Sequence, residues 1–556
     1  MTDTSAPIPG EQPDRMFPKL TPEQVARVAL QGEIRSVEAG EVLVEAGKQT
    51  TRFYVVKTGQ IDVVRVSCDA EELVAIARAG QFTGELNLLS GRQSLVQLRA
   101  SEPGEVIQMA REQLLGLVQA DSELSEVFMR AFILRRMELI ARGIGDVALV
   151  GSSNSAGTLR IREFLTRNGH PYTSIDVERD PDVQELLDRF QVHVEEVPIV
   201  ICHGVNVLRN PSNQQLAECL GFNDAIDRSQ VRDLVIIGAG PAGLAAAVYA
   251  ASEGIDVLVV EGNGPGGQAG SSSRIENYLG FPNGISGQEL AARAYTQAQK
   301  FGARILIAKS ATRLHCDRKP YSVNIDDGSQ VQAHTVIIAT GAQYRRLPLE
   351  NLAQFEGAGV YYGATFVEAQ LCSGEEVIVV GGGNSAGQAA VFLARTARRV
   401  HVLIRSAGLK ETMSQYLIRR MEDHPGIVVR TRSEIVALEG SDHLDHVRWR
   451  DNQSGEIEVH PISHVFVMMG ANPCTGWLDS CLVLDDSGYI KTGPDLSQDN
   501  LSTAQWPLAR GPYFLETSVP AVFAVGDVRS GNLRRVAAAV GEGSNVVSFV
   551  HRVLSE

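Results

Sequence analysis

The stretch DLVIIGAGPAGLAAAVYAASEGIDVLVVE, residues 233–261, decides the fold of the C-terminal half of the chain. It reads as an apolar strand, a glycine-rich turn, an alanine-rich helix and a second apolar strand that ends on an acid. Gly238 allows a tight turn, Gly240 allows the backbone to approach a pyrophosphate, and Gly243 allows close helix–strand packing. Glu261, at the end of the second strand, can bind a pair of ribose hydroxyls. The stretch therefore predicts a dinucleotide bound at a helix N-terminus.

A second stretch, EVIVVGGGNSAGQAAVFLARTARRVHVLIRS, residues 376–406, repeats this order. Its turn positions are taken by Gly381, Gly383 and Ala386. The second strand ends in Arg405 instead of an acid, and Lys410 follows closely. A basic residue at this place suits a 2′-phosphate and favours NADPH over NADH, the alternative being a solvated basic turn. Two such turns predict two nucleotides, of which FAD suits the acid-ended turn and NADPH the basic one.

Length and composition set the limits for the rest of the chain. A chain of 556 residues predicts three or four domains at roughly 150 residues each. Hydrophobic residues make up 44% and charged residues 21%, which is typical of soluble globular proteins. The net charge of −15 argues against nucleic acid as the main partner. Because no apolar run is long enough to span a bilayer and the N-terminus is polar, we expect a cytoplasmic protein without membrane association.

Residues 231–556 resemble the low-molecular-weight thioredoxin reductase family. The motifs that carry the resemblance are GAGPAG (238–243), GGQ (266–268), RIENYLGFP (274–282), ATGA (339–342), GGGNSA (381–386) and VFAVGDV (522–528). The resemblance implies two Rossmann-like α/β domains, in which an FAD domain (230–345 and 465–556) carries an inserted NADPH domain (346–464). It also implies a homodimer, in which the NADPH domain swings relative to the flavin.

The resemblance further implies the residues of the flavin site. Gln268 and Asn277 would lie beside the flavin, and Asp527 would hold its ribityl chain. Val536 would present its backbone N–H to the pyrimidine edge at the start of a helix. The remaining flavin-site residues implied are Gly267, Gly526, Arg534 and Arg535.

The family's redox dithiol is missing from this sequence. In that family a CxxC pair lies just upstream of the NADPH turn, and the matching stretch here is GVYYGATFVEAQLC (359–372). Its dithiol positions fall on Ala364 and Val367, neither of which can carry electrons. Cys372 lies nearby in a helix-like stretch and is expected to be a small buried hydrophobe, with a redox role as the alternative. None of the seven cysteines forms a CxxC, so we expect unpaired thiols in a reducing compartment, without zinc or structural disulfides.

A second module, residues 146–225, resembles the glutaredoxin and thioredoxin fold. The carriers are its order of strands and helices, including a helix at 180–190, and Val197–Pro198, which matches the cis-proline of that fold. The position of that fold's CxxC falls at Ser155–Ala156–Gly157–Thr158, again without cysteine. We therefore expect a docking or dimerisation module, or a plain spacer, instead of a dithiol acceptor.

The N-terminal module, residues 17–145, resembles a cyclic-nucleotide-binding β-roll and follows a loose tail (1–16). It begins with a predicted helix from Thr21 to Leu30, continues with short alternating strands and closes with a helical stretch over 111–142. GQFTGELNLLSG (80–91) corresponds to the family's phosphate-binding cassette, where Gly84 and Glu85 match.

The arginine that this family uses to pair the cyclic phosphate is displaced. Its place falls on Ser94, and Arg92 stands two residues early. A cyclic nucleotide, another small ligand and no ligand therefore all remain open for this module.

The combined expectation is an FAD-dependent NADPH oxidoreductase of thioredoxin-reductase type. Its electrons would pass to an acceptor outside the chain, either a small molecule or a redox protein such as a partner disulfide. The alternatives are a redox or ligand sensor regulated through the N-terminal modules, and direct thioredoxin reduction through Cys372.

Overall fold

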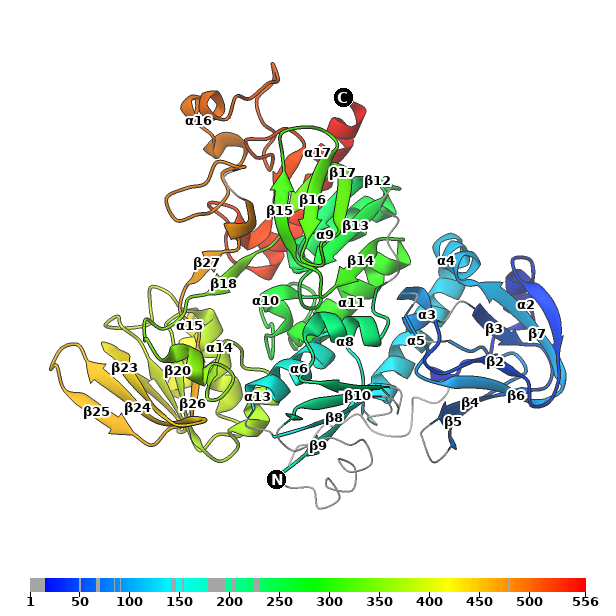
Figure 1. The fold of residues 1–556 in the computed structure, drawn as a ribbon, viewed down its shortest axis with the longest axis horizontal. Helices are drawn as coiled ribbons and strands as arrows, with labels where there is room; N and C mark the ends of the chain where they lie inside the picture. Colours follow the sequence, from blue (N-terminus) through cyan, green and yellow to red (C-terminus); the bar gives the residue numbers. More distant parts are fainter. Residues whose placement is uncertain are drawn as a thin grey trace. The chain divides into compact units, whose positions relative to one another are not determined.

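The computed structural model describes residues 16–49, 52–66, 71–84, 86–90, 92–141, 147–152, 155–178, 196–202, 206–223, 230–478 and 481–556. It divides into two compact units (Figure 1). The first unit comprises Met1–Val150, Gly169–Ile226 and Thr296–Ile307, and the second comprises Gly151–Asn168, Asp227–Tyr295 and Ala308–Glu556.

The first unit contains the predicted β-roll, built from two antiparallel sheets. One sheet has the order β1 (Glu33–Val37), β7 (Gly104–Ala110), β3 (Arg52–Val56). The other has the order β2 (Val42–Val44), β6 (Gln97–Glu102), β4 (Gln60–Val66), β5 (Glu71–Arg78). The short helix α3 (Leu86–Ser90) follows the turn after β5, and four phenylalanine rings, Phe53, Phe82, Phe128 and Phe132, pack in the core beneath.

The helices of the β-roll follow the prediction with one difference. Helix α2 (Pro22–Ala29) begins with a capping box between Thr21 and Gln24, in which each side chain satisfies the other's backbone N–H. The predicted single helical stretch is two helices, α4 (Arg111–Ala120) and α5 (Ser122–Ala141). The break falls at Asp121, whose extended backbone lets its carboxylate accept the N–H of Leu124 at 3.0 Å.

The second module forms a four-stranded sheet in the order β11 (Asn206–Arg209), β10 (Ile199–Cys202), β8 (Val147–Gly151), β9 (Thr173–Asp176). Strand β10 runs antiparallel to both β8 and β11. Helix α6 (Ala156–Arg167) leaves β8, and α8 (Asn213–Cys219) follows β11. The Val197–Pro198 peptide bond is cis, as predicted, whereas the helix expected at 180–190 lies outside the described residues.

The first α/β sheet of the second unit contains the stretch that opened the sequence. Its order is β13 (Val257–Glu261), β12 (Val231–Ile237), β17 (Gln330–Ile338), β16 (Tyr321–Ile325), β15 (Ala311–His315). Strand β28 (Val522–Ala524), from near the C-terminus, pairs in parallel with β17. Helices α9 (Pro241–Ser252) and α17 (Val536–Ser555) pack tightly together beside this sheet (Figure 1). Helix α11 (Gly287–Lys300) and strand β14 (Arg304–Ile307) follow in the chain.

The second α/β sheet is fully parallel. Its order is β19 (Val360–Tyr361), β26 (His464–Val467), β20 (Glu376–Val380), β21 (Arg399–Leu403), β22 (Ile427–Arg430). Its helices are α13 (Phe366–Leu371), α14 (Asn384–Leu393) and α15 (Gln415–Glu422). An antiparallel sheet of β23 (Ser433–Gly440), β24 (Leu444–Asp451) and β25 (Ile457–His460) follows, and β18 (Ala342–Tyr344) pairs with β27 (Ala471–Pro473).

The prediction that every cysteine is unpaired is wrong. Cys316 and Cys481 form a disulfide, with their Cα atoms 6.3 Å apart. The two residues are separated by 165 positions, so only the folded chain brings them together, and local spacing carried no sign of it. Among the described cysteines, Cys372 and Cys474 are free thiols.

Two further observations concern the described part of the chain only. None of its helices combines the length and the apolar character that crossing a bilayer requires. It also contains no group of three or more side chains placed to hold a metal ion.

Candidate functional site

The first glycine turn has the geometry that its sequence predicts. Gly238 has a φ of 105°, which is the left-handed region, and a Cβ at Gly243 would lie 1.9 Å from the Gly238 carbonyl oxygen. At Gly240 the nearest atom to an added Cβ would be the Cα of Gly267, at 3.9 Å. Gly238 and Gly243 therefore exclude a side chain because the fold leaves no room or no suitable backbone conformation for one. Gly240, in contrast, leaves open space at the N-terminus of α9. Space of this kind, facing unpaired helix N–H groups, suits a pyrophosphate.

Glu261 lies at this turn, as predicted. Its carboxylate accepts hydrogen bonds from the backbone N–H of Ala239 at 2.7 Å and of Asn263 at 2.9 Å. Burial raises the pKa of Glu261, and these backbone donors only partly oppose that effect. The two hydrogen bonds fix the carboxylate at the end of β13, where it can accept further bonds from ribose hydroxyls.

Two distant segments meet the first turn. A Cβ at Gly267 would lie 3.1 Å from the Cα of Gly240, and a Cβ at Gly526 would lie 2.9 Å from the Cβ of Ala242. Burial raises the pKa of Asp527, the nearby Arg534 opposes this, and Glu542 adds to it. The fold thus brings the GGQ and VGDV motifs together around the N-terminus of α9.

The start of α17 presents the other expected flavin residues. Val536 is the first residue of the helix, so its N–H has no partner within the helix. Arg534 and Arg535 are exposed, and the Arg534 guanidinium stacks on the Tyr489 ring 5.3 Å from its centroid. Asn277 is exposed and does not line the cavity beside Gln268.

That cavity, of about 30 Å³, is lined in part by Tyr344 and Met468, which no sequence motif had indicated. Its lining includes Gln268, Tyr344, Ala364, Ser385 and Met468. Gln268 donates to the carbonyl of Ala342, and burial raises the pKa of Tyr344. Tyr344 follows the ATGA motif by two residues, which was the only available signal.

The second glycine turn repeats the geometry of the first. Gly381 has a φ of 144°, and a Cβ there would lie 2.4 Å from the Met468 carbonyl oxygen. An added Cβ at Gly383 would meet no atom within 4 Å, which leaves open space before helix α14. Ala386, in the first turn of that helix, is fully buried.

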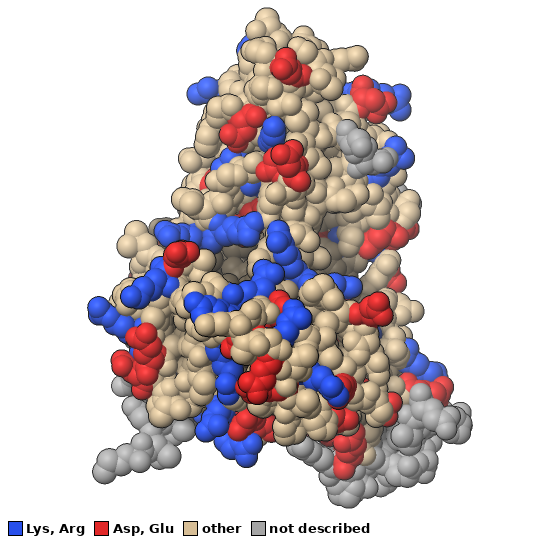
Figure 2. All heavy atoms as spheres, turned by 90° about the vertical axis from the view of Figure 1, so that its left-hand side faces the viewer, with Lys and Arg blue, Asp and Glu red and all other residues tan. Residues whose placement is uncertain are grey.

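Basic side chains lie beside this second turn. Arg405 and Lys410 are exposed, and neither forms an ion pair with another residue that the structure describes. Asn384 accepts hydrogen bonds from the N–H of Ser414, at 2.7 Å, and from its hydroxyl, which fastens the segment carrying the two bases. On the side of the molecule where these elements lie in Figure 1, Lys and Arg side chains gather around a hollow (Figure 2).

We expect Arg405→Glu to raise the KM for NADPH roughly tenfold or more while changing the KM for NADH little. A glutamate at this exposed position would repel a 2′-phosphate, which NADH lacks. Steady-state kinetics with both dinucleotides measures the ratio, and Arg432→Glu, on the neighbouring strand connection, is the matched control. Equal changes for both dinucleotides would remove Arg405 from phosphate recognition.

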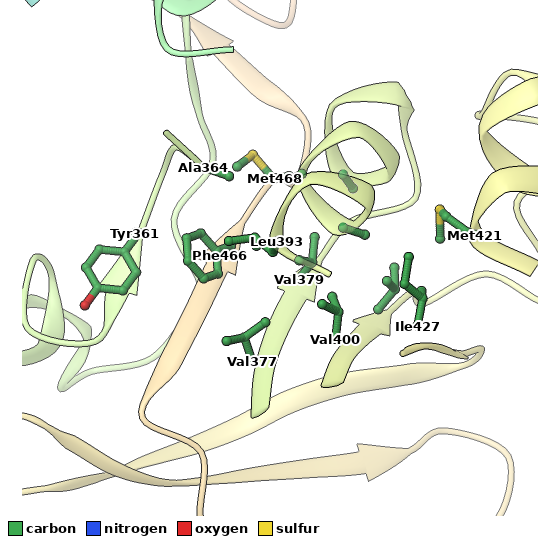
Figure 3. Close-up of a cluster of buried hydrophobic side chains, with 14 of the residues drawn as sticks. Tyr361, Ala364, Val377, Val379, Leu393, Val400, Met421, Ile427, Phe466 and Met468 are labelled. Atoms are coloured by element: carbon green, nitrogen blue, oxygen red, sulfur yellow. The ribbon is translucent and has the colours of Figure 1, made fainter. Parts of the chain in front are cut away.

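The dithiol positions lie in an apolar core. Ala364 is 5% exposed and Val367 is 6% exposed, and both belong to one cluster with Phe466 and Met468. Figure 3 shows Ala364 directed toward Met468 and Phe466, between the strands and the helix of this core. The two positions at which the sequence predicts the family's dithiol therefore lie in an apolar core, and Ala364 also borders the cavity beside Gln268.

Helix α6 contributes to the same apolar core as Ala364 and Val367. Leu159 belongs to the same apolar cluster, and Ala156 packs so closely on Gly357 that an added Cβ would lie 2.9 Å from it. At the other end of α6, Gln288 donates to the Thr166 carbonyl at 2.8 Å and Asn168 donates to that of Asn263. Two CxxC motifs were expected from the resemblances, one at residues 155–158 and one at 364–367. The start of α6, which contains the first of these positions, lies against Gly357, just before the segment with the second.

An acid pair joins α6 to α13. Burial, together with the neighbouring Glu368, raises the pKa of Glu163 to about 8. The Glu368 carboxylate accepts the Thr365 N–H at 2.7 Å and caps α13.

Cys372 is a buried thiol, as predicted. Its side chain is 0% exposed in the same core, and burial raises its pKa to about 12. A thiolate is therefore strongly disfavoured, and with it any disulfide exchange at this sulfur.

We expect the native protein to leave Cys372 unlabelled by iodoacetamide at neutral pH, because alkylation needs an accessible thiolate. Mass spectrometry of peptides from native and urea-unfolded samples measures this, and the partly exposed Cys219 is the internal control. Rapid native labelling of Cys372 would contradict its burial and reopen a redox role.

The cassette of the β-roll departs from a cyclic-nucleotide site. Gly84 has a φ of 96°, and Glu85 lies outside the described residues. Ser94 is buried and its hydroxyl donates to the Val96 carbonyl at 2.7 Å. Arg92 is also buried, with its guanidinium 4.3 Å above the Phe222 ring of the second module.

Two protein families match this chain. Residues 232–543 match the family described as pyridine nucleotide-disulphide oxidoreductase, and residues 34–121 match the cyclic nucleotide-binding domain. The chain is 33% identical over 315 residues to a thioredoxin reductase of Ureaplasma parvum, covering 56% of this chain and 94% of the relative. It is also 33% identical over 326 residues to a thioredoxin reductase of Mycolicibacterium smegmatis, covering 59% and 97%.

Solved structures give the same result. The thioredoxin reductase of T. acidophilum superposes with a TM-score of 0.52 at 28% identity, covering 59% of this chain and 100% of that one. The Lactococcus lactis thioredoxin reductase, in its FR conformation, superposes with a TM-score of 0.52 at 26% identity, covering 58% and 99%.

Proposed function

The chain belongs to the pyridine nucleotide-disulphide oxidoreductase family, and from this membership we propose that it passes electrons from NADPH, through FAD, to an acceptor outside the chain without an in-chain dithiol. It is an NADPH-dependent oxidoreductase whose cofactors are FAD and NADPH, and it carries a cyclic nucleotide-binding domain at residues 34–121. The proposal concerns the route by which electrons leave.

The residues at the two turns fit these two cofactors. The open spaces at Gly240 and Gly383 place helix N-termini where pyrophosphates would lie. Glu261 would orient the FAD ribose, and Arg405 with Lys410 would pair with the 2′-phosphate of NADPH. When both cofactors are bound, they supply hydride transfer from the nicotinamide to the flavin.

The flavin end of the site is formed by other segments. Gln268 and Tyr344 line the cavity beside which the ring system would bind, and Asp527 would hold the ribityl chain. The free N–H of Val536 would donate to the pyrimidine edge, where the positive end of α17 favours the extra electron density of the reduced state.

The single observation that carries the proposal is the packing at the dithiol positions. Ala364 and Val367 lack sulfur and belong to an apolar core that also contains Leu159 of α6. The only cysteine close in sequence, Cys372, is fully buried with a pKa near 12. An acceptor must therefore reach the flavin itself, which suits a small oxidant or a redox protein more than the dithiol relay of a thioredoxin reductase.

The proposal extends to the second module, for which we propose a glutaredoxin- or thioredoxin-like fold over 146–225. Its strand order β9-β8-β10-β11, its helix after β8 and its cis Val197–Pro198 bond support this. We also propose a division of the C-terminal region into an FAD domain (230–345, 465–556) and an NADPH domain (346–464). Assembly as a homodimer is part of the same proposal.

Anaerobic mixing with NADPH tests electron entry. We expect the absorbance band of the oxidised flavin to disappear on the timescale of seconds, because the turnover of such enzymes is of that order. A flavin that stays oxidised for minutes would contradict the proposal. Reoxidation by a panel of quinones, dyes and disulfide proteins then tests the exit, and rapid turnover with thioredoxin alone would contradict a dithiol-free route.

The match to a cyclic nucleotide-binding domain favours a second candidate, a sensor in which flavin state and ligand state regulate each other. A sensor would accept electrons from NADPH yet turn over slowly with every acceptor of the panel. Sustained turnover with one acceptor would support the oxidoreductase and exclude the sensor.

A further inference from the structure

The β-roll encloses a cavity of about 110 Å³ that none of the sites above uses. The described residues that line it come from β2 to β6, α3 and α5, together with residues 16–17, the turn at 82–84 and the segment before β6. Most of its wall is aliphatic, formed by Val44, Val63, Val74, Ala75, Ala77, Leu88, Val96, Leu98 and Leu139. We call this space the β-roll cavity.

The polar side chains inside the β-roll cavity already have partners. The Ser94 hydroxyl donates to the Val96 carbonyl at 2.7 Å, and the Thr83 hydroxyl bonds to the backbone of Tyr54. Neither hydroxyl can bind a ligand without giving up a bond that it makes in a buried position.

Arg135 is the only buried cation of the lining, and its donors are also engaged. Its Nε donates to the Met16 carbonyl at 3.0 Å, its Nη1 to that of Gly84 at 2.8 Å, and its Nη2 to that of Phe82 at 3.1 Å. The guanidinium also stacks between the rings of Phe17 and Phe82. It therefore holds the cavity wall together and is not presented to a ligand.

The two remaining charged residues of the lining do not make a phosphate site. Arg52 is exposed, so water at the mouth of the cavity screens its charge. Glu138 adds an acidic side chain to the same lining, which is therefore not uniformly basic. Arg92, the arginine two residues before the expected cassette position, stacks on Phe222 and is not part of the lining.

We propose that the β-roll cavity binds an apolar small molecule of about the size of one ring, and not a cyclic nucleotide. Among the described residues of the lining, Ser94, Thr83 and Arg135 are already engaged, so a phosphate or ribose could bind them only at the expense of these bonds. An apolar ligand loses none, and it gains contact with the aliphatic wall. The size also agrees, because an apolar protein cavity of roughly 150 Å³ holds benzene.

Fluorine NMR of fluorobenzene with the full-length protein tests this. We expect its resonance to broaden and shift with wild-type protein, and to keep the free line shape with Ala77→Phe, whose ring would fill the cavity. Ala77 is 3% exposed in the wall, whereas Ala120 is exposed at the end of α4, so Ala120→Phe is the matched control and should behave as wild type.

Three results would overturn the proposal. The first is no broadening with wild-type protein, and the second is unchanged broadening with Ala77→Phe. The third is displacement of fluorobenzene by cyclic AMP or cyclic GMP at micromolar concentration. If Ala77→Phe does not fold, Val96→Phe fills the same space from the position just before β6 and serves in its place.

Discussion

Gly243→Ala is expected to abolish FAD binding. A Cβ at this position would lie 1.9 Å from the Gly238 carbonyl oxygen, and no rotamer can relieve this because Cβ is fixed to the backbone. Helix α9 would have to move away from β12, which opens the turn on which the pyrophosphate rests. We expect bound flavin to fall below about a tenth of the wild-type content, measured by flavin absorbance after gel filtration.

Gly240→Ala is the matched comparison within the same turn. Its methyl group would meet no protein atom closer than 3.9 Å, so the fold and the thermal stability of the apoprotein should stay near wild type. The methyl would occupy the space that we assign to the pyrophosphate, so the Kd for FAD should rise by about tenfold or more. Full flavin content in Gly243→Ala, or unchanged affinity in Gly240→Ala, would contradict the assignment of this turn.

Glu163→Gln is expected to stabilise the protein at alkaline pH. The pKa of Glu163 is about 8 in the folded chain, against the ordinary value of 4.5 expected on unfolding. Between these values the folded state holds a proton that the unfolded state has released, so rising pH favours unfolding and stability falls until about pH 8. Glutamine keeps a neutral donor for Glu368 and cannot ionise, so it removes this loss, which is on the order of 2–4 kcal/mol.

Melting temperatures of wild type and Glu163→Gln, measured from acidic to alkaline pH, test this expectation. The two curves should lie close together near pH 5 and separate as pH rises toward 8, with the variant more stable. Glu422→Gln, at the exposed end of α15, is the control and should follow wild type throughout. Parallel curves for Glu163→Gln and wild type would mean that Glu163 is ionised at neutral pH and that α6 lies less closely on α13.

Local patterns predicted the parts of the site that depend on local geometry. The turns at Gly238 and Gly381 require conformations or contacts that only glycine allows, and these requirements are visible in the sequence as spacing. The burial of Cys372 followed from its place in an apolar helix-like stretch. Each of these features depends on residues within about one turn of helix or one strand.

Features that depend on distant contacts were not predicted. The Cys316–Cys481 disulfide joins residues 165 positions apart, and Tyr344 and Met468 meet beside Gln268 only because separate segments converge there. The presence of Leu159 and Ala364 in one apolar core is of the same kind, because neither stretch carries a local sign of the other. The break at Asp121 was missed because a side-chain cap competed with a continuous helical pattern.

The measurement that tests the central claim most directly is an anaerobic titration of the purified flavoprotein with NADPH, counted in electrons per FAD. A dithiol relay stores four electrons, two on the flavin and two on the sulfurs, whereas a chain with Ala364 and Val367 at the dithiol positions should store two. We predict complete flavin reduction at one NADPH per FAD and no further consumption. Consumption of a second equivalent of NADPH would contradict the absence of a second electron store. If Cys316→Ser no longer consumed that second equivalent, the additional electrons would be assigned to the Cys316–Cys481 disulfide.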